Sequence, residues 1–314
     1  MCSMKKAIFE TLSYFDIFHY PLTKEELYFF LWKESGKVHK NIFFDELSSL
    51  VEKKEIGEKN GLYFLLGSEI AIENRMEKEW VLHEKIKRAR RAVIILQYIP
   101  YIRAVFLCNQ FFVSTRNTSD IDVLIITHPK RIWIVRFFSL LFMGLFRMRI
   151  KKGKEKDKIC LSFFVAEDSL DFSSLALPEK DIYLAYWIVN LVPLLDLQNI
   201  YQRILKENKY WLKRFFPHIR EEYVFHPLLR VKENKVIKYI RIFFERGWRA
   251  GYGDLVQEQM KDMQKKKLER NNLLRDTEDK SIVVNDHMLK FHINDRRLFY
   301  KNEWIKKIEL YGQK

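Results

Sequence analysis

Residues 103–127 read RAVFLCNQFFVSTRNTSDIDVLIIT, and this stretch decides the expected fold of the central region. Its first apolar run, Ala104 to Leu107, suits a short buried strand. Its last run, Asp120 to Ile126, suits a second strand rich in β-branched residues. A turn and a short helix are expected between the two runs. The region therefore predicts two strands that flank one polar loop.

Two aspartates begin the second of these strands. Because side chains alternate along a strand, Asp120 and Asp122 are expected to project close together from the same face. Two carboxylates so placed repel each other unless a cation lies between them, and Mg²⁺ and Mn²⁺ both accept carboxylate oxygens as ligands. The pair predicts a divalent metal site with Asp120 and Asp122 as ligands and catalytic residues. The alternative is a pair of solvated turn residues.

The order of strand, loop and Asp-x-Asp strand resembles the DNA polymerase beta-like nucleotidyltransferase superfamily, whose first strand ends in Gly-Ser or Gly-Gly. The whole chain resembles uncharacterised bacterial proteins in which a winged helix precedes such a domain. The resemblance implies Mg²⁺- or Mn²⁺-dependent transfer of a nucleoside monophosphate from a nucleoside triphosphate to an acceptor, with release of pyrophosphate. The residues that carry the wider resemblance are 12–23 (LSYFDIFHYPLT), 119–122, 131–133, 157–161 and 289–292.

The positions of Gly-Ser are taken here by Cys108 and Asn109. Without glycine the backbone approaches a phosphate less closely, but the Asn109 amide can still donate to a phosphate oxygen. We expect Cys108, Asn109 and Ser119 to contact the nucleotide. Residues 114–116 (Ser-Thr-Arg) could line a phosphate path, with an exposed short helix as the alternative.

The third carboxylate that the resemblance implies is not evident, because the next expected strand, residues 159–165, contains no acid. Asp157 precedes that strand, and Glu167 and Asp168 follow it, so these are the alternatives nearest in sequence. Two functions remain open on this ground: a nucleotidyltransferase, or a catalytically degenerate protein that binds nucleotides and regulates.

Residues 1–67 are expected to form a winged-helix domain. Thr23 and Glu26 form a capping box after a first helix that Pro21 stops, and residues 59–61 form a turn between two short strands. Residues 1–66 carry nine Lys against ten acids, a balance of −1. Packing or protein contact is therefore favoured over DNA binding, although a DNA-binding regulator stays an alternative.

The formal net charge is +15, and residues 130–158 hold ten Lys or Arg against two acids, a balance of +8. This basic segment is where we expect a nucleotide, RNA or another polyanion to approach. The alternative is a solvated loop that keeps the protein in solution.

The chain of 314 residues is long enough for more than one core. We expect an α+β protein with a connecting helix at 68–97, a nucleotidyltransferase-like mixed-sheet core with flanking helices at 98–178, and a mostly helical region at 179–314. Within that last region helices are predicted over 183–197, 200–216 and 236–263.

The three cysteines show no paired spacing, and no secretion signal opens the sequence. The longest apolar stretch, residues 132–146, contains Arg136 and falls short of the roughly 20 residues that span a bilayer, so a buried helix is expected there. These features predict a cytoplasmic protein without membrane contact.

Overall fold

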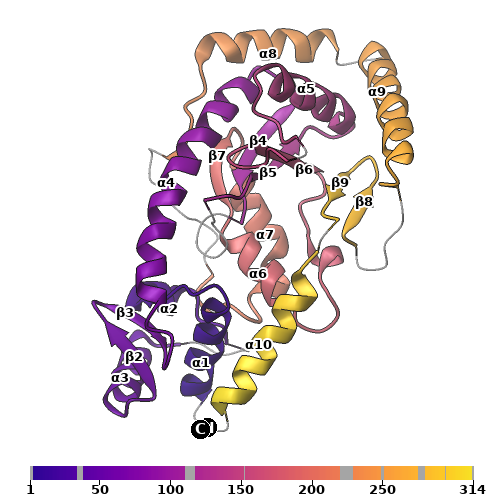
Figure 1. The fold of residues 1–314 in the computed structure, drawn as a ribbon. Helices are drawn as coiled ribbons and strands as arrows, with labels where there is room; N and C mark the ends of the chain where they lie inside the picture. Colours follow the sequence, from indigo (N-terminus) through magenta and orange to yellow (C-terminus); the bar gives the residue numbers. More distant parts are fainter. Residues whose placement is uncertain are drawn as a thin grey trace.

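A computed structural model describes residues 3–33, 38–109, 117–151, 153–219, 229–248, 251–274, 280–293 and 295–312. In this part of the chain the fold is α+β, with one mixed sheet of six strands and a separate sheet of three. Figure 1 shows the small sheet at the lower end of the molecule, the large sheet in the upper half, and both termini at the lower end.

The N-terminal elements include the predicted first helix and the predicted pair of short strands, together with a strand at the capping box that was not predicted. They are α1 (Ser3–Asp16), β1 (Leu22–Thr23), α2 (Lys24–Phe29), α3 (Lys40–Glu52), β2 (Ile56–Lys59) and β3 (Leu62–Leu65), with β1 and β2 both antiparallel to β3. The Thr23 hydroxyl accepts from the backbone N–H of Glu26 at 3.2 Å, and the Thr23 N–H donates to the Glu26 carboxylate at 2.8 Å. The predicted capping box is therefore confirmed. Asn60 (φ 56°) and Gly61 (φ 75°) are both left-handed, as a two-residue hairpin turn requires.

Helix α4 (Ala71–Leu96) joins this region to the large sheet. Near its start, Arg75 donates to a Glu26 carboxylate oxygen at 2.7 Å and to the Pro21 carbonyl at 2.6 Å. Near its end, Val93 and Leu96 are buried in the core of the large sheet. The predicted connecting helix is confirmed, and it is held at both ends.

The large sheet has the strand order β7-β4-β5-β6-β9-β8. Its members are β4 (Ile102–Leu107), β5 (Ile121–Thr127), β6 (Ile159–Ala166), β7 (Val192–Asp196), β8 (Ile282–Val284) and β9 (Met288–Phe291). Strands β5 and β6 are parallel, whereas every other neighbouring pair is antiparallel. The predicted strands at 104–107, 120–126 and 159–165 are confirmed. The sheet also reaches beyond the expected core of 98–178, because residues from 192 and from 282 onward add strands to both edges.

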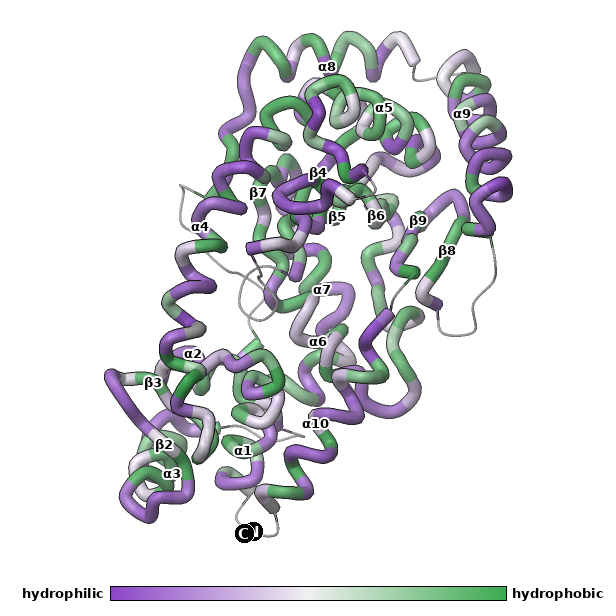
Figure 2. The backbone as a smooth tube through the Cα atoms, in the orientation of Figure 1, coloured by the Kyte–Doolittle hydropathy of each residue, from purple (hydrophilic) through white to green (hydrophobic). Residues whose placement is uncertain are grey.

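Helix α5 (Ile132–Leu145) connects β5 to β6, as a parallel pair requires. Its first turn is fully buried, but Leu141 and Leu145 are 49% and 71% exposed. Figure 2 shows that most of this helix is hydrophobic. The helix is thus buried all round in its first turn and along one side after it, where Ser139 and Met143 are fully buried.

The prediction of a single helix over 183–197 is wrong beyond Val189. Helix α6 (Ile182–Val189) ends there, and the chain continues as β7. Pro193 lies within β7 and has no N–H to donate, but β7 is an edge strand and tolerates this loss. The spacing of the apolar residues did not distinguish this short buried strand from a continued helix.

The single helix expected over 236–263 is two helices, α8 (Lys235–Gly247) and α9 (Gly251–Arg270). A Cβ atom at Gly253 would lie 1.8 Å from the Trp248 carbonyl oxygen, so this close approach needs glycine. The remaining elements are the 3₁₀ turn η1 (Ser173–Leu175), α7 (Ile200–Leu212) and α10 (Arg297–Gly312).

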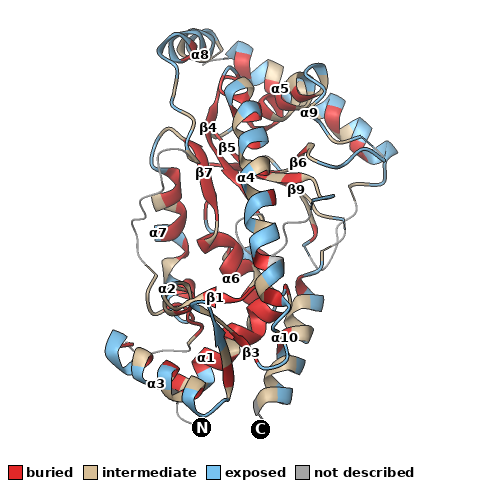
Figure 3. Ribbon diagram, turned by 60° about the vertical axis from the view of Figure 1, so that its left-hand side comes forward, coloured by how far each residue is buried: buried red, intermediate tan, exposed pale blue. Residues whose placement is uncertain are grey.

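The two faces of the large sheet are covered by two cores (Figure 3). One core joins the sheet to α4, α5 and α9. The other joins it to α6, α7, α10 and the N-terminal helices. Within this second core Tyr14 stacks on Tyr186 at 4.4 Å between ring centroids, and Trp32 stacks on Phe215 at 4.4 Å. The N-terminal elements therefore share a core with residues far along the chain. Within the described ranges, none of the helices is long and apolar enough to cross a bilayer.

Candidate metal centre

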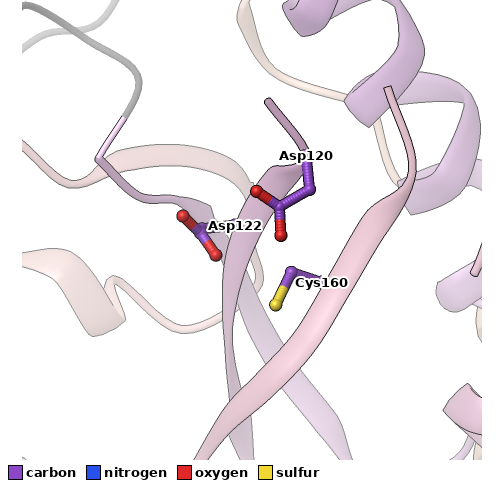
Figure 4. A group of neighbouring side chains, drawn as sticks. All are labelled: Asp120, Asp122 and Cys160. Carbon is purple, nitrogen blue, oxygen red and sulfur yellow. The ribbon is translucent and has the colours of Figure 1, made fainter. Parts of the chain in front are cut away.

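Asp120 and Asp122 come together at the start of β5. One ligand atom from each of Asp120, Asp122 and Cys160 lies within 4.8 Å of the others (Figure 4). Asp122 and Cys160 are register partners in the parallel pair β5–β6, so the sheet itself sets their separation. The expectation that the two aspartates share a face is confirmed, and the neighbouring strand presents a thiol to them.

None of the acids considered as a third carboxylate belongs to this group. Asp157 lies 3.5 Å from Arg88 and 3.8 Å from Lys85. Glu167 pairs with Arg203 at 2.9 Å and with Arg103 at 3.5 Å. Asp168 lies 3.3 Å from His287. Cys160 occupies the position beside the aspartates. Because its strand contains no acid, nothing in the sequence indicated that this strand contributes to the metal group.

The electrostatics of the group follow from its partial burial. Burial, and then the neighbouring Asp120, raise the pKa of Asp122 to about 6, while hydrogen bonds from Asn109 and Cys160 act in the opposite direction. Burial and the charge of Asp122 raise the pKa of the Cys160 thiol well above its ordinary value. Cys160 is therefore a neutral thiol at pH 7.

Cys108 and Asn109 follow β4, next to these carboxylates. The Cys108 side chain is 4% exposed within the core, and its N–H donates to the Asp122 backbone oxygen at 3.0 Å. Asn109 adopts a left-handed φ of 54°, a conformation that glycine would take at lower cost. The Asn109 amide donates to Asp122 Oδ2 at 3.3 Å and accepts from the Tyr183 hydroxyl at 3.0 Å. Asn109 thus orients Asp122.

Ser119 is held by a buried cation, Lys85, that was not predicted as part of the site. The Lys85 side chain is 1% exposed, and its Nζ donates to the Ser119 carbonyl at 2.5 Å, to the Ser119 hydroxyl at 3.0 Å and to the Asp120 carbonyl at 3.3 Å. Burial lowers the pKa of Lys85, while Asp157 and then Asp120 act to raise it. Lys85 lies on the buried stripe of α4 with Val81, Ala89 and Leu96. The sequence signal for its burial is that Lys85 recurs at helical spacing with the apolar residues of α4.

The carboxylates open into a pocket of about 430 Å³. Its far wall comes from the C-terminal part of the chain, from α6, β9 and the start of α10. The residues outside the metal group that line it are Asn109, Phe163, Leu175, Tyr183, Leu184, Trp187, Lys290, His292, Asp295, Arg296, Arg297 and Tyr300. The C-terminal region, expected to be a separate helical part, therefore completes the site.

Of the three cations that the described residues contribute to the pocket wall, two already hold carboxylates. Lys290 lies 3.3 Å from Asp295, and Arg297 lies 3.0 Å from Asp181. Arg296 is exposed, with its guanidinium 4.9 Å from the Phe299 ring and 5.8 Å from the Tyr300 ring. Among residues that the structure describes, Arg296 forms no ion pair. Arg296 is thus the pocket cation best placed to receive an anion.

The basic segment of residues 130–158 meets the site through its last residues. The Ile121 N–H donates to the Lys158 carbonyl at 2.8 Å, and the Asp157 N–H donates to the Ser119 carbonyl at 3.1 Å. Arg131, at the start of the segment, serves packing, since it pairs with Asp254 at 2.7 Å. The suggested phosphate path at residues 114–116 lies outside the described residues.

No protein-family model, no curated protein and no solved structure matches this chain.

Proposed function

We propose that this chain binds a nucleoside triphosphate together with a divalent cation in the pocket above Asp120 and Asp122. The observation that carries the proposal is the pair of neighbouring carboxylates at a pocket of about 430 Å³ with Arg296 in its wall. A volume of this size is typical of small-molecule sites. A polyanion of phosphates needs positive charge, and an ion between the carboxylates and a nearby guanidinium supply it at two points.

Two of the three side chains in the metal group, those of the aspartates, suit a hard cation. Asp120 and Asp122 provide the oxygen ligands that Mg²⁺ and Mn²⁺ take, whereas a protonated thiol such as that of Cys160 is a poor ligand for Mg²⁺. A bound divalent ion would neutralise and orient the phosphates. The chain's own part is positional: Lys85 holds the backbone before and at Asp120, and Asn109 holds the Asp122 carboxylate.

The finer fold assignments belong to the same proposal. We assign residues 98–178 to a nucleotidyltransferase-like core, supported by the antiparallel pair β4–β5, the parallel pair β5–β6 and Asp-x-Asp at the start of β5. We assign residues 1–67 to a winged helix, supported by the order of elements and by the pairing of β1 with β3. The first assignment agrees with the superfamily that the sequence resembles, and the second agrees with the bacterial proteins in which a winged helix precedes such a domain.

Nucleotidyl transfer is the second candidate function. It is favoured by the position of both aspartates at the pocket, where an ion held between them would lie beside bound phosphates. In that reaction an acceptor hydroxyl attacks the α-phosphorus, its proton leaves, and the bond to pyrophosphate breaks. The neutral thiol of Cys160 in place of a third carboxylate favours binding over transfer, because it offers no charge to a second ion.

DNA binding through the N-terminal region receives less support. Tyr14 and Trp32 are buried against Tyr186 and Phe215, so this region already uses its aromatic residues for internal packing. We propose packing as its role. An RNA or other polyanion at the basic segment and a cytoplasmic location remain parts of the proposal. Cys108 and Cys160 are free thiols, which agrees with a reducing compartment.

Fluorescent nucleoside triphosphate analogues test the proposal. Binding with Mg²⁺ or Mn²⁺ that chelation by EDTA abolishes would support it, and release of labelled pyrophosphate in the presence of candidate acceptors would support the second candidate. Equal binding with and without a divalent ion would contradict the metal-dependent account.

A further inference from the structure

Helix α8 turns its apolar side chains away from the protein. Five residues form this α8 stripe, with exposed fractions of 66% for Val236, 72% for Tyr239, 38% for Ile240, 73% for Phe243 and 41% for Phe244. Their spacing of three and four residues places them on one side of the helix. Figure 3 shows α8 as an exposed helix at the upper end of the molecule, above the buried strands.

The opposite side of α8 carries Arg241, Glu245 and the buried Ile237, which is 5% exposed, and it contacts the protein body. Glu245 accepts from the Tyr101 N–H at 2.7 Å and from the Arg103 guanidinium at 2.9 Å. Arg241 is 7% exposed and donates to Glu233 at 2.6 Å. A surface helix ordinarily buries its apolar side and exposes its charges. In α8 five apolar residues are exposed while Arg241 is buried, and the contacts of Glu245 with Tyr101 and Arg103 fix that orientation.

Exposed cations lie beside the α8 stripe: Lys235 and Arg246 border it on one side, and Lys238 lies towards the polar side of the helix. Lys235, Lys238 and Arg246 are exposed, while Glu245, the acid within this helix, faces the protein. Lys238 has only a distant partner, Glu233, at 4.0 Å. The outer surface of α8 therefore combines apolar and aromatic groups with positive charge, on a chain whose formal net charge is +15.

We propose that the α8 stripe docks on the surface of an anionic phospholipid membrane. The helix has 13 residues, so it is about 20 Å long and lies along the interface rather than across it. Aromatic and aliphatic side chains enter the boundary between headgroups and acyl chains, and the flanking cations contact anionic headgroups. Figure 1 shows α8 lying along the outer end of the molecule, with the other labelled elements below it. The expectation of no membrane contact rested on the lack of a spanning segment, which an interfacial helix does not need.

A second copy of the chain is the competing occupant. In a twofold interface the same surface meets itself, so the cations Lys235, Lys238 and Arg246 of both copies would be brought into one interface. Like charges at an interface oppose association, whereas anionic lipids neutralise these cations. The charge pattern therefore favours lipid.

Vesicle flotation with the full chain tests this inference. We expect the protein to float with vesicles of phosphatidylcholine mixed with phosphatidylserine, to stay unbound with phosphatidylcholine alone, and to be released by high salt. Tyr239→Ser/Phe243→Ser should weaken binding by roughly tenfold or more. Lys235→Gln/Lys238→Gln/Arg246→Gln should weaken it by roughly a hundredfold.

The control variant is Met76→Ser/Trp80→Ser on α4. These two side chains are 72% and 64% exposed and have the same four-residue spacing as Tyr239 and Phe243. This variant should bind vesicles as the native chain does. The thermal midpoint of every variant should stay near the native value, because the altered side chains are exposed. If the serine variant at α8 unfolds, the variant at the three cations still tests the docking.

Failure of the native chain to bind phosphatidylserine vesicles would overturn the proposal. So would unchanged binding by the α8 serine variant, or an equal loss in the α4 control. A dimer in sedimentation that the α8 serine variant dissolves, without vesicle binding by the native chain, would assign the stripe to a second copy instead. Nucleotide binding is measured separately, so neither result depends on the proposed function.

Discussion

The Nζ atom of Lys85 lies 2.5 Å from the Ser119 carbonyl oxygen and 3.3 Å from that of Asp120. A helix from the connecting region thus places a buried ammonium directly behind the residue that begins the metal group. The two backbone carbonyls accept hydrogen bonds from Lys85 where water cannot reach, because the lysine side chain is only 1% exposed. Lys85 is a positioning residue for Asp120.

Lys85→Met should remove the ammonium donor from both carbonyls and leave them only the neutral donors, the Asp157 N–H and the Ser119 hydroxyl. We expect the free energy of unfolding to fall by roughly 1–3 kcal/mol, since buried acceptors lose a charged partner. Metal and nucleotide affinity should fall about tenfold, as happens when a group that orients a ligand is removed. Urea unfolding and titration calorimetry measure the two effects. Lys87→Met is the control, because Lys87 is exposed on the same helix and pairs with Glu84 only at the surface. Native affinity in Lys85→Met would contradict this role.

Cys160→Asp should convert the group into three carboxylates. Without metal this variant should be less stable than the native chain, because a third negative charge joins Asp120 and Asp122. Mg²⁺ should then bind about tenfold tighter or more and restore the stability, since binding to the folded state alone stabilises it. Thermal unfolding across a Mg²⁺ series reports both.

Cys160→Ser is the matched variant, since it keeps a neutral side chain of similar size and should leave Mg²⁺ affinity near the native value. If Cys160→Asp shows no gain in Mg²⁺ affinity over Cys160→Ser, position 160 does not face the bound ion.

His292 should make the protein less stable in mild acid. Burial, with Lys290 and Arg297 nearby and opposed by Asp295, lowers the pKa of His292 to about 4, against an ordinary value of 6.5. As the pH falls from about 6.5 to about 4, the unfolded chain takes up this proton first, so the free energy of unfolding decreases, by up to about 3 kcal/mol. His292→Gln should flatten this dependence in urea unfolding across that pH range. The exposed His287→Gln should not, and identical slopes in all three proteins would refute the assignment.

Trp32→Ala should destabilise the whole chain. Trp32 is fully buried and stacks on Phe215, so its removal should cost about 3–5 kcal/mol. Because Tyr14 and Trp32 share a core with α6 and the residues after α7, calorimetric unfolding should show one transition that shifts as a unit. Two transitions, of which only one moves, would mean that residues 1–67 unfold separately. Trp80→Ala, at an exposed tryptophan, is the control.

The sequence predicted those features that depend on local pattern. Alternation placed Asp120 and Asp122 on one face, and the capping box at Thr23 and Glu26 located the start of α2. Both depend on residues within a few positions of each other. A single strand or cap carries such information without knowledge of its distant neighbours.

What could not be predicted depends on which segments meet in space. Cys160 joins the aspartates only because β6 pairs with β5 in one particular register. Much of the pocket wall comes from residues 288–300, near the C-terminal end of the chain. Their strand, β9, reaches the site by pairing with β6. The strand at Val192 to Asp196 carried helix-like spacing, and sheet pairing overrode it. Lys85 was hidden because a charged residue in a charged helix looks solvated until the core it enters is known.

Titration calorimetry of each nucleoside triphosphate with Mg²⁺ or Mn²⁺ tests the central claim most directly. It compares the native chain with Asp120→Asn/Asp122→Asn and with Asp168→Asn/Asp171→Asn, a control at two acids that do not line the pocket. The account predicts metal-dependent binding by the native and control proteins and its loss in Asp120→Asn/Asp122→Asn. Absence of binding by the native chain to every triphosphate, or undiminished binding by Asp120→Asn/Asp122→Asn, would contradict it.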